Sequence, residues 1–296
     1  MTKLGKYLLE KNIRVYLLAL LFSLFPWPGN FLAAILVGLV TLHKGWKNGL
    51  AVVAWVALPA VGALVFQRLS LFDILLVRCV LVWAFAVLLL RAKSLSYITQ
   101  LLAVVGVVVV TICHLVVPDM PATWMSLFDQ YIKNQDFAAT LKLSPGELTQ
   151  YLQRFSHVAT GAVVFISLLG VIIPLFLARW WQSAISGAGL FRQEFGLLRM
   201  THMASGIMLI ATVGLYWQID WLRDIYPVLV FPFFFAGLSL THVLARKYKH
   251  LFFMLIVVYL LLVMLTYLMV SLLAIIGFID CWYAFRERHT LLEKSY

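Results

Sequence analysis

Arg78 is the residue whose type and position most strongly indicate chemistry in this sequence. It lies within an apolar stretch, residues 71–90, that is long enough to cross a membrane as a helix. A charged side chain in such a helix normally faces a partner or a water-filled cavity. Three roles for Arg78 stay open: contact with an anion or polar ligand, an ion pair with another helix, and snorkelling of the guanidinium to lipid phosphates.

Four histidines form a second set of candidates, because they fall in pairs at similar depth. His114 and His157 flank the polar interval 118–154, whereas His202 and His242 lie at the inner ends of two later apolar runs. Two histidines on neighbouring helices can bind a metal or both axial positions of a haem. Hydrogen bonding between helices and proton coupling are the commoner uses, and we favour these.

Patterns of soluble catalytic or metal-binding sites are missing from the sequence. Cys79, Cys113 and Cys281 stand alone, without the paired spacing of a zinc site or a disulfide framework. The sequence has no Ser/His/Asp set, no paired carboxylates and no HExxH. We therefore expect no enzyme, no metal and no cofactor, with a haem- or quinone-linked electron carrier as a remote alternative.

Composition indicates which elements must position these residues. Of 296 residues, 64% are hydrophobic and 12% are charged, whereas soluble chains are nearer half apolar and a quarter charged. At about 20 residues per span, the chain has room for roughly eight to ten membrane segments. Because helices satisfy their own backbone groups in lipid, we predict an all-α fold, a polytopic integral membrane helical bundle forming one domain over residues 1–296.

Apolar runs give the expected order of segments along the chain. The expected segments are 13–25, 31–42, 49–66, 71–90, 95–117, a sixth that ends near Ala178, 201–217, 227–244 and 251–279. Residues 220–226 are expected to form a short polar turn before the segment 227–244. The last would measure roughly 43 Å as one helix, against a hydrocarbon core of ~30 Å. It is either one strongly tilted span or two short helices broken near Thr266 and Tyr267, and we favour two.

The polar interval 118–154 is predicted to be an amphipathic outer loop. Apolar residues at 124, 127, 128 and 131 share one helical face, which favours a helix on the membrane surface. Ser144 and Glu147 have the spacing of a capping box, with Pro145 at the first helical position. We expect the helix that begins there to continue into the sixth span.

The distribution of basic residues predicts the orientation of the chain. With the N-terminus inside, most of the Lys and Arg residues fall in inner segments, which is the bias that cytoplasmic loops show. The expected outer segments carry only Arg68, Lys133, Lys142, Arg154 and Arg223. The net charge of +11 therefore indicates membrane orientation and not nucleic acid. Both termini are expected on the cytoplasmic side.

The segment after the sixth span carries a family resemblance. The run Ala178-Arg179-Trp180-Trp181-Gln182, the following Gly189, Phe191, Glu194-Phe195 and Leu198-Arg199, and the stretches 238–242 and 280–286 resemble the YybS-like family of bacterial inner-membrane proteins. That family usually has Asn-Pro-Gly-Gly where this chain has Gly187-Ala188-Gly189-Leu190. The resemblance implies a bacterial inner-membrane location and a distant similarity to the substrate-binding components of energy-coupling-factor transporters.

These observations lead to two main functional hypotheses. The first is binding or transport of a small solute through the bundle, with Arg78, His114 and His157 as ligand contacts and a membrane or cytoplasmic protein as partner. The second is a non-catalytic scaffold or assembly factor. Glycine pairs suited to contacts within such a bundle, or with its partner, are Gly161 with Gly170 and Gly206 with Gly214. The cytoplasmic basic and aromatic segment 179–200 and its surroundings supply the expected contacts with a partner or lipid: Arg179, Trp180, Trp181, Arg192, Glu194, Arg199, His202 and His242.

Overall fold

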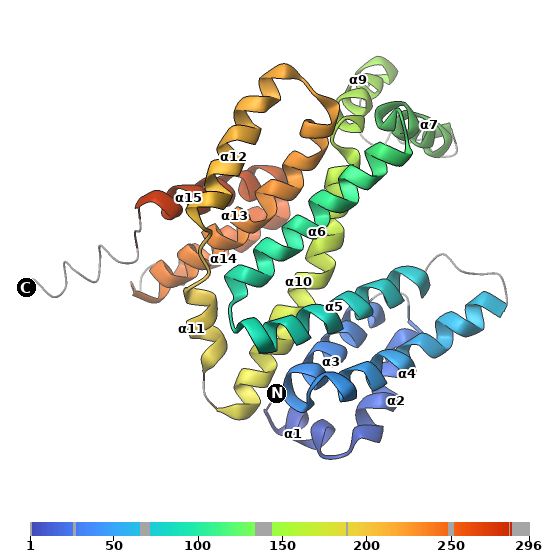
Figure 1. The fold of residues 1–296 in the computed structure, drawn as a ribbon, viewed down its shortest axis with the longest axis vertical. Coiled ribbons are helices and arrows are strands. Elements are labelled where there is room, and N and C mark those ends of the chain that lie inside the picture. Colours follow the sequence, from blue (N-terminus) through green and yellow to red (C-terminus); the bar gives the residue numbers. More distant parts are fainter. Residues whose placement is uncertain are drawn as a thin grey trace, which may run out of the picture. The chain divides into compact units, whose positions relative to one another are not determined.

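A computed structural model describes residues 2–25, 28–65, 72–133, 144–187, 189–247, 252–283 and 285. Every regular element among these residues is a helix, which confirms the all-α prediction (Figure 1). Within the described ranges, five helical segments are long and apolar enough to cross a membrane: Leu75–Ala92, Leu95–Val116, Ala159–Ser186, Asp220–Lys247 and Thr266–Tyr283. Four shorter apolar segments are Asn12–Ser23, Gly29–Lys44, His202–Trp217 and Phe253–Met264.

Large apolar side chains cover much of the helix surface. Ile166, Ile210 and Val263, for example, are largely exposed, although each lies in an apolar helix. Water-soluble proteins rarely expose apolar area on this scale, whereas lipid tails accept it. The chain is therefore a multi-pass integral membrane protein.

The chain divides into two compact units, of which unit 1 comprises residues 1–98 and 167–198. Its helices are α1 (Thr2–Glu10), α2 (Asn12–Ser23), α3 (Gly29–Lys44), α4 (Trp46–Val65), α5 (Phe72–Ala92), the second half of α10 (Ala159–Ser186) and α11 (Leu190–Gly196). Helix α3 forms the core and packs against α2, α4 and α5. Its small residues permit this, since Ala33, Ala34 and Val37 are fully buried.

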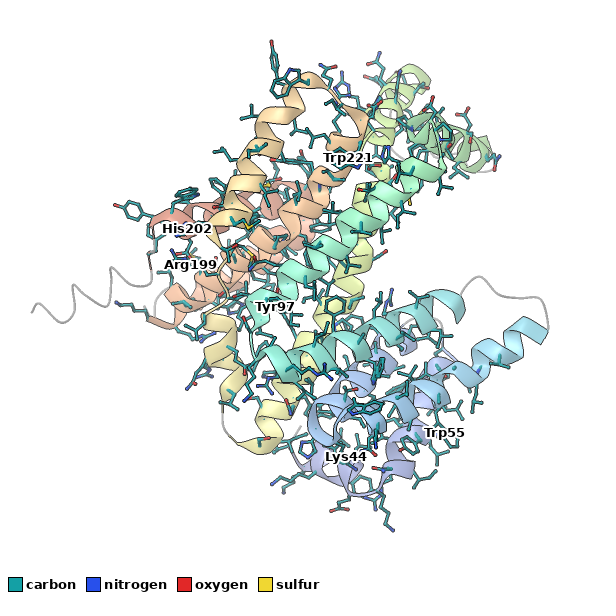
Figure 2. All side chains as sticks on the ribbon, in the orientation of Figure 1. Lys44, Trp55, Tyr97, Arg199, His202 and Trp221 are labelled. Carbon is teal, nitrogen blue, oxygen red and sulfur yellow. The ribbon has the colours of Figure 1, made fainter. Side chains whose placement is uncertain are left out.

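A hydrogen bond and an aromatic contact join the first helices of unit 1. The Lys44 ammonium at the end of α3 donates to the Asn12 side chain at the start of α2, at 2.6 Å. Trp55 of α4 stacks on Tyr16 of α2 with ring centroids 5.9 Å apart. Figure 2 labels Lys44 and Trp55 among these helices. The first apolar runs thus fold as a compact group of short helices.

Unit 2 comprises residues 99–166 and 199–296. Its helices are α6 (Leu95–Val116, from residue 99 on), α7 (Met120–Lys133), α9 (Pro145–Ser156), the first part of α10, α12 (His202–Gly214), the short η1 (Leu215–Trp217), α13 (Asp220–Lys247), α14 (Phe252–Met264) and α15 (Thr266–Tyr283). Helix α13 is the core of this unit, with Phe231, Phe233 and Phe235 almost fully buried.

Two glycines bring the backbones of α13 and α15 into close contact in unit 2. A Cβ atom added to Gly237 would lie 1.8 Å from the Leu273 carbonyl oxygen, and one added to Gly277 would lie 2.1 Å from the Phe233 carbonyl oxygen. Small residues let helix backbones meet in this way in membranes, where packing rather than water exclusion drives association. The glycines therefore set the distance between α13 and α15.

Helices α7 and α9 pack together within the polar interval, as an amphipathic pair. Trp124 stacks on Phe128, and Phe128 contacts Phe155 of α9 with ring centroids 6.0 Å apart. The predicted capping box is confirmed, since Ser144 and Glu147 exchange side-chain and backbone hydrogen bonds. The backbone N–H and hydroxyl of Ser144 donate to the exposed Glu147 carboxylate and thereby lower its pKa.

Two predicted boundaries of the sixth span are wrong. Helix α9 ends at Ser156 and α10 begins at Ala159, so the capped helix does not continue into the span. At the other end α10 continues past Ala178 to Ser186, where the sequence predicted a loop. The polar residues after Ala178 do not end the helix, because Arg179 and Gln182 find hydrogen-bond partners within unit 1.

The predicted polar turn 220–226 is also wrong, because these residues form the first turns of α13. This helix contains both Pro227 and Pro232. Proline removes a backbone donor, but neighbouring helices and side chains compensate for that loss in membrane proteins.

The apolar run at the C-terminal end is divided as predicted. Helix α14 ends at Met264 and α15 begins at Thr266, so two short helices replace one long span.

Candidate functional site

A partly buried polar region of unit 2 lies at the start of α13. Asp220 and Asp224 are four residues apart and therefore lie on the same side of the helix, one turn from each other. The Asp224 side chain is 2% exposed, whereas that of Asp220 is 48% exposed. One carboxylate is thus enclosed by protein, and the other reaches the surface.

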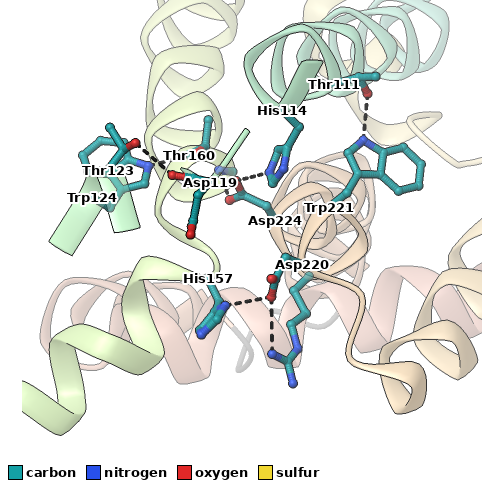
Figure 3. A network of polar contacts seen from close by, with 12 residues as sticks. Thr111, His114, Asp119, Thr123, Trp124, His157, Thr160, Asp220, Trp221 and Asp224 are labelled. Carbon is teal, nitrogen blue, oxygen red and sulfur yellow. Dashed lines mark hydrogen bonds and ion pairs between the residues drawn. The ribbon is translucent and has the colours of Figure 1, made fainter. Parts of the chain in front are cut away.

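Asp224 is held from two neighbouring helices. Its Oδ2 lies 2.9 Å from Nε2 of His114 on α6, and its Oδ1 accepts the Gly161 backbone N–H of α10 at 2.6 Å. Figure 3 shows His114 and Asp224 reaching toward each other from their helices. A Cβ atom at Gly161 would lie 1.7 Å from the Asp224 backbone oxygen. Glycine is therefore needed for α10 to approach this closely.

Asp220 has its own histidine. Nδ1 of His157, between α9 and α10, lies 2.8 Å from Oδ1 of Asp220. Arg223 Nη1 lies 3.7 Å from the same oxygen. We call the groups His114, His157, Asp220, Asp224 and the Gly161 N–H the α13 N-terminal cluster.

Two tryptophans flank the cluster with indole hydrogen bonds. Trp124 of α7 donates to the Thr160 hydroxyl at 2.9 Å, and Trp221 of α13 donates to the Thr111 hydroxyl at 3.1 Å. Figure 3 shows Trp124 near Thr160 and Trp221 below Thr111. Thr160 precedes Gly161 directly, and Thr111 lies one turn before His114. The tryptophans therefore hold in place the helix segments that carry the cluster.

The chemistry available to this cluster is proton binding and hydrogen bonding. An ionised carboxylate cannot donate, so the His114 Nε2 must carry the proton in the bond to Asp224. The His114 Nδ1 is then the ring atom that can accept a proton. Among the side chains that the structure describes, no three His, Cys, Asp or Glu groups are arranged to hold a metal ion.

Arg78, the third predicted ligand contact, lies in unit 1 on α5. Its guanidinium lies against α10 at Gly170, where an added Cβ atom would be 3.0 Å from Nε and 3.1 Å from Nη2. Gly170 thus provides the space for the charged group. Among the described residues, no carboxylate forms an ion pair with Arg78. The structure therefore groups His114 with His157, both bonded to α13 aspartates, and places Arg78 in the other unit.

The predicted partner-contact segment is largely tied within unit 1. Both Nε and Nη2 of Arg179 bond the Glu194 carboxylate, so the end of α10 is joined to α11. The Gln182 side chain donates to the Leu42 carbonyl of α3 at 2.6 Å. Phe176, Phe191 and Phe195 form an aromatic cluster under the same turn. Trp180 and Arg192 are exposed, whereas Trp181 is half-buried.

Glycine conformations explain the turn between α10 and α11. Gly187 has φ +72° and Gly189 has φ +60°, both in the left-handed region that favours glycine. The chain therefore reverses there and brings Glu194 back to Arg179.

The remaining three predicted contact residues lie in unit 2. Arg199 Nη2 donates to the Cys281 carbonyl of α15 at 2.8 Å, and the His202 ring lies 5.2 Å from that of Trp282. Figure 2 shows Arg199 and His202 beside the end of α15. His242 Nε2 lies 2.9 Å from the Tyr259 hydroxyl of α14. All three join helices within unit 2.

Sequence reasoning missed Asp220 and Asp224 as site residues. It assigned them to a short polar turn, residues 220–226, before the apolar run 227–244. Their spacing of four residues at the start of an apolar run was the available signal, since it predicts one acidic face at a helix N-terminus.

No known protein family, curated protein or solved structure matches this chain.

Proposed function

We propose that this membrane protein binds a small polar solute within its helical bundle and acts with a partner as a carrier or as the solute-binding component of one. The observation that supports this most is Arg78. Its guanidinium lies inside an apolar helix, against the Gly170 backbone, with no ion-pair partner among the described carboxylates. A membrane-embedded cation that pairs with no described carboxylate is suited to contact an anionic or polar solute.

The family resemblance points to the same class of function. It implies a bacterial inner-membrane protein that is distantly similar to the substrate-binding components of energy-coupling-factor transporters. The exposed Trp180 and Arg192, beside the Arg179–Glu194 pair, are suited to contact a cytoplasmic partner or anionic lipid headgroups.

Native mass spectrometry of protein extracted gently in detergent tests this proposal. We expect the wild-type protein to retain a co-purifying small molecule, detected as an added mass that dissociates on activation. The Arg78→Leu variant should lose that mass, because the solute loses its cationic contact. Arg91→Leu is the matched control, since Arg91 is an exposed arginine at the end of the same helix and should leave retention unchanged.

Absence of any retained mass from wild-type protein, or equal retention by Arg78→Leu, would contradict the proposal.

A scaffold or assembly factor is the second candidate, and a different observation favours it. Among the described residues, the interactions that link polar groups from different helices include His114–Asp224, Arg179–Glu194 and His242–Tyr259. A co-purifying protein subunit without a small molecule would favour the scaffold.

A further inference from the structure

We propose that His114 and Asp224 form a proton-binding site inside unit 2, which takes up one proton and thereby changes the buried pair from net negative to neutral. The site itself requires only the geometry of this pair. Its use to couple proton uptake to solute movement rests on the proposed function.

The two oxygens of Asp224 are committed to different helices. Oδ1 accepts the Gly161 N–H of α10, and Oδ2 faces Nε2 of His114 on α6. The carboxylate is 2% exposed and the imidazole 16% exposed. Water therefore contributes little to solvating the Asp224 carboxylate, and its two hydrogen bonds are its principal stabilising contacts.

The protonation chemistry follows from which atoms are engaged. With His114 neutral, Nε2–H donates to Asp224 and the pair carries one net negative charge. A proton taken from water binds Nδ1, the free ring atom, and yields an imidazolium beside a carboxylate. No bond between the helices has to break in this step. Proton uptake therefore removes the net charge of the buried pair.

The charged groups around the His114–Asp224 pair have partners of their own. His157 faces Asp220, and Arg223 lies near the same carboxylate, one helical turn before Asp224. Asp119, before α7, accepts the Ala122 backbone N–H and thereby caps that helix. His157 and Asp220 are 31% and 48% exposed. This second pair can therefore exchange protons with water beside the enclosed one.

The charge state of the pair is linked to helix packing. The bond from Gly161 to Asp224 joins α10 to α13 at the point where their backbones are in contact. His114 adds α6 to the same carboxylate. A change in the charge of this carboxylate–imidazole pair thus acts on three helices of unit 2 at once, as a proton-coupling element requires.

The proposal is tested on the full-length protein in lipid nanodiscs by a pH titration. Nitrogen NMR follows the His114 imidazole, assigned by its loss in His114→Gln, and infrared spectroscopy of isotope-labelled aspartate follows the carboxyl groups. Wild-type protein should show the His114 imidazole gaining a proton and the carboxylate band of a buried aspartate shifting over the same pH interval, since the two groups share a hydrogen bond. In Asp224→Asn this shared step should be lost.

His202→Gln is the control, because His202 stacks on Trp282 and not on a carboxylate, and the shared step should persist. A His114 signal that titrates identically in Asp224→Asn, or that never titrates while the protein stays folded, overturns the proposal. If Asp224→Asn does not fold, the wild-type coincidence of the two signals decides by itself.

Arg78→Leu separates this inference from the proposed function. It should lose solute retention and leave the His114 titration intact, because the bonds of His114 and Asp224 are to each other and to Gly161. In wild-type protein, absence of the titration step together with normal solute retention refutes the proton site alone. In wild-type protein, absence of a retained solute together with a normal titration refutes the solute-binding proposal alone.

Discussion

Arg179 and Glu194 illustrate how single residues hold an element in place. Their side chains are only 15% and 19% exposed, and the guanidinium bonds the carboxylate through two nitrogens. Such paired, charge-assisted bonds have fixed geometry and are stronger than neutral ones. The pair therefore joins α11 to the end of α10, and exposed neighbours such as Trp180 keep a defined position.

Removing one member of this pair should destabilise the protein. Arg179→Leu leaves the Glu194 carboxylate mostly out of water without its counter-ion, so we expect the free energy of unfolding to fall by about 2 kcal/mol. Chemical denaturation in detergent measures this loss. Arg192→Leu, a change at an exposed arginine of α11, should cost clearly less.

The double variant Arg179→Leu/Glu194→Leu then isolates the interaction between the two residues. It should lose less stability than the sum of the two single variants, because neither charge is left alone. Additive losses would show that the pair is not energetically coupled.

At the scale of elements, the contact of α13 with α15 depends on glycine rather than on large side chains. Carbonyl oxygens of each helix lie where a Cβ atom of the other would be, at Gly237 and Gly277. Backbone atoms cannot move aside as a flexible side chain can. The two helices are therefore sensitive to a single methyl group at this contact.

Gly237→Ala should force α13 and α15 apart and destabilise unit 2 by about 3 kcal/mol, at the upper end of overpacking effects. Gly206→Ala is the matched control, because nothing lies within 4 Å of a Cβ atom added there. Thermal unfolding in the same detergent compares the two. Equal melting temperatures for both variants would show that the α13–α15 contact is not tight in the folded protein.

At the scale of the whole molecule, orientation across the membrane is the property on which the functional proposals depend. We propose a bacterial inner membrane location with both termini in the cytoplasm, from the distribution of Lys and Arg. In that arrangement the segment with α7 and α9 is outside and the segment with α11 is inside.

Single cysteines in a cysteine-free variant test this orientation in intact cells. Ser144→Cys, at the exposed start of α9, should react with a membrane-impermeant maleimide, whereas Gln193→Cys, exposed on α11, should react only after the membrane is opened. Labelling of both positions from the same side contradicts the orientation.

Local patterns predicted much of the fold. The alternation of apolar and polar residues around Trp124 predicted the amphipathic α7, the Ser144–Glu147 spacing predicted the cap of α9, and the length of the last apolar run favoured its division. In each case the information lies within a few turns of one helix. The residues of the candidate site were named only in part from the sequence: His114 and His157 were candidates, but Asp220 and Asp224 were not.

The sequence misplaced helix ends where residues far away in the chain determine them. The α10 helix extends past Ala178 because Glu194 and Leu42 supply partners for its polar side chains. Gly161 and Gly170 were expected to lie in close contacts and do so, yet Gly206 faces open space and the important Gly237 was not identified. The sequence around a glycine does not show which helix backbone will contact it.

The amino-acid sequence by itself determined that lipid is the solvent of this chain, because the core of a water-soluble protein could not bury so large an apolar fraction. It determined the helical class because helices satisfy their own backbone hydrogen bonds in lipid. Only the tertiary structure decided that His114 meets Asp224, more than a hundred positions later in the chain, and that Gly161 completes the carboxylate's shell. Hydropathy and periodicity act within one helix, whereas an ion pair depends on which helices lie side by side and in what rotation.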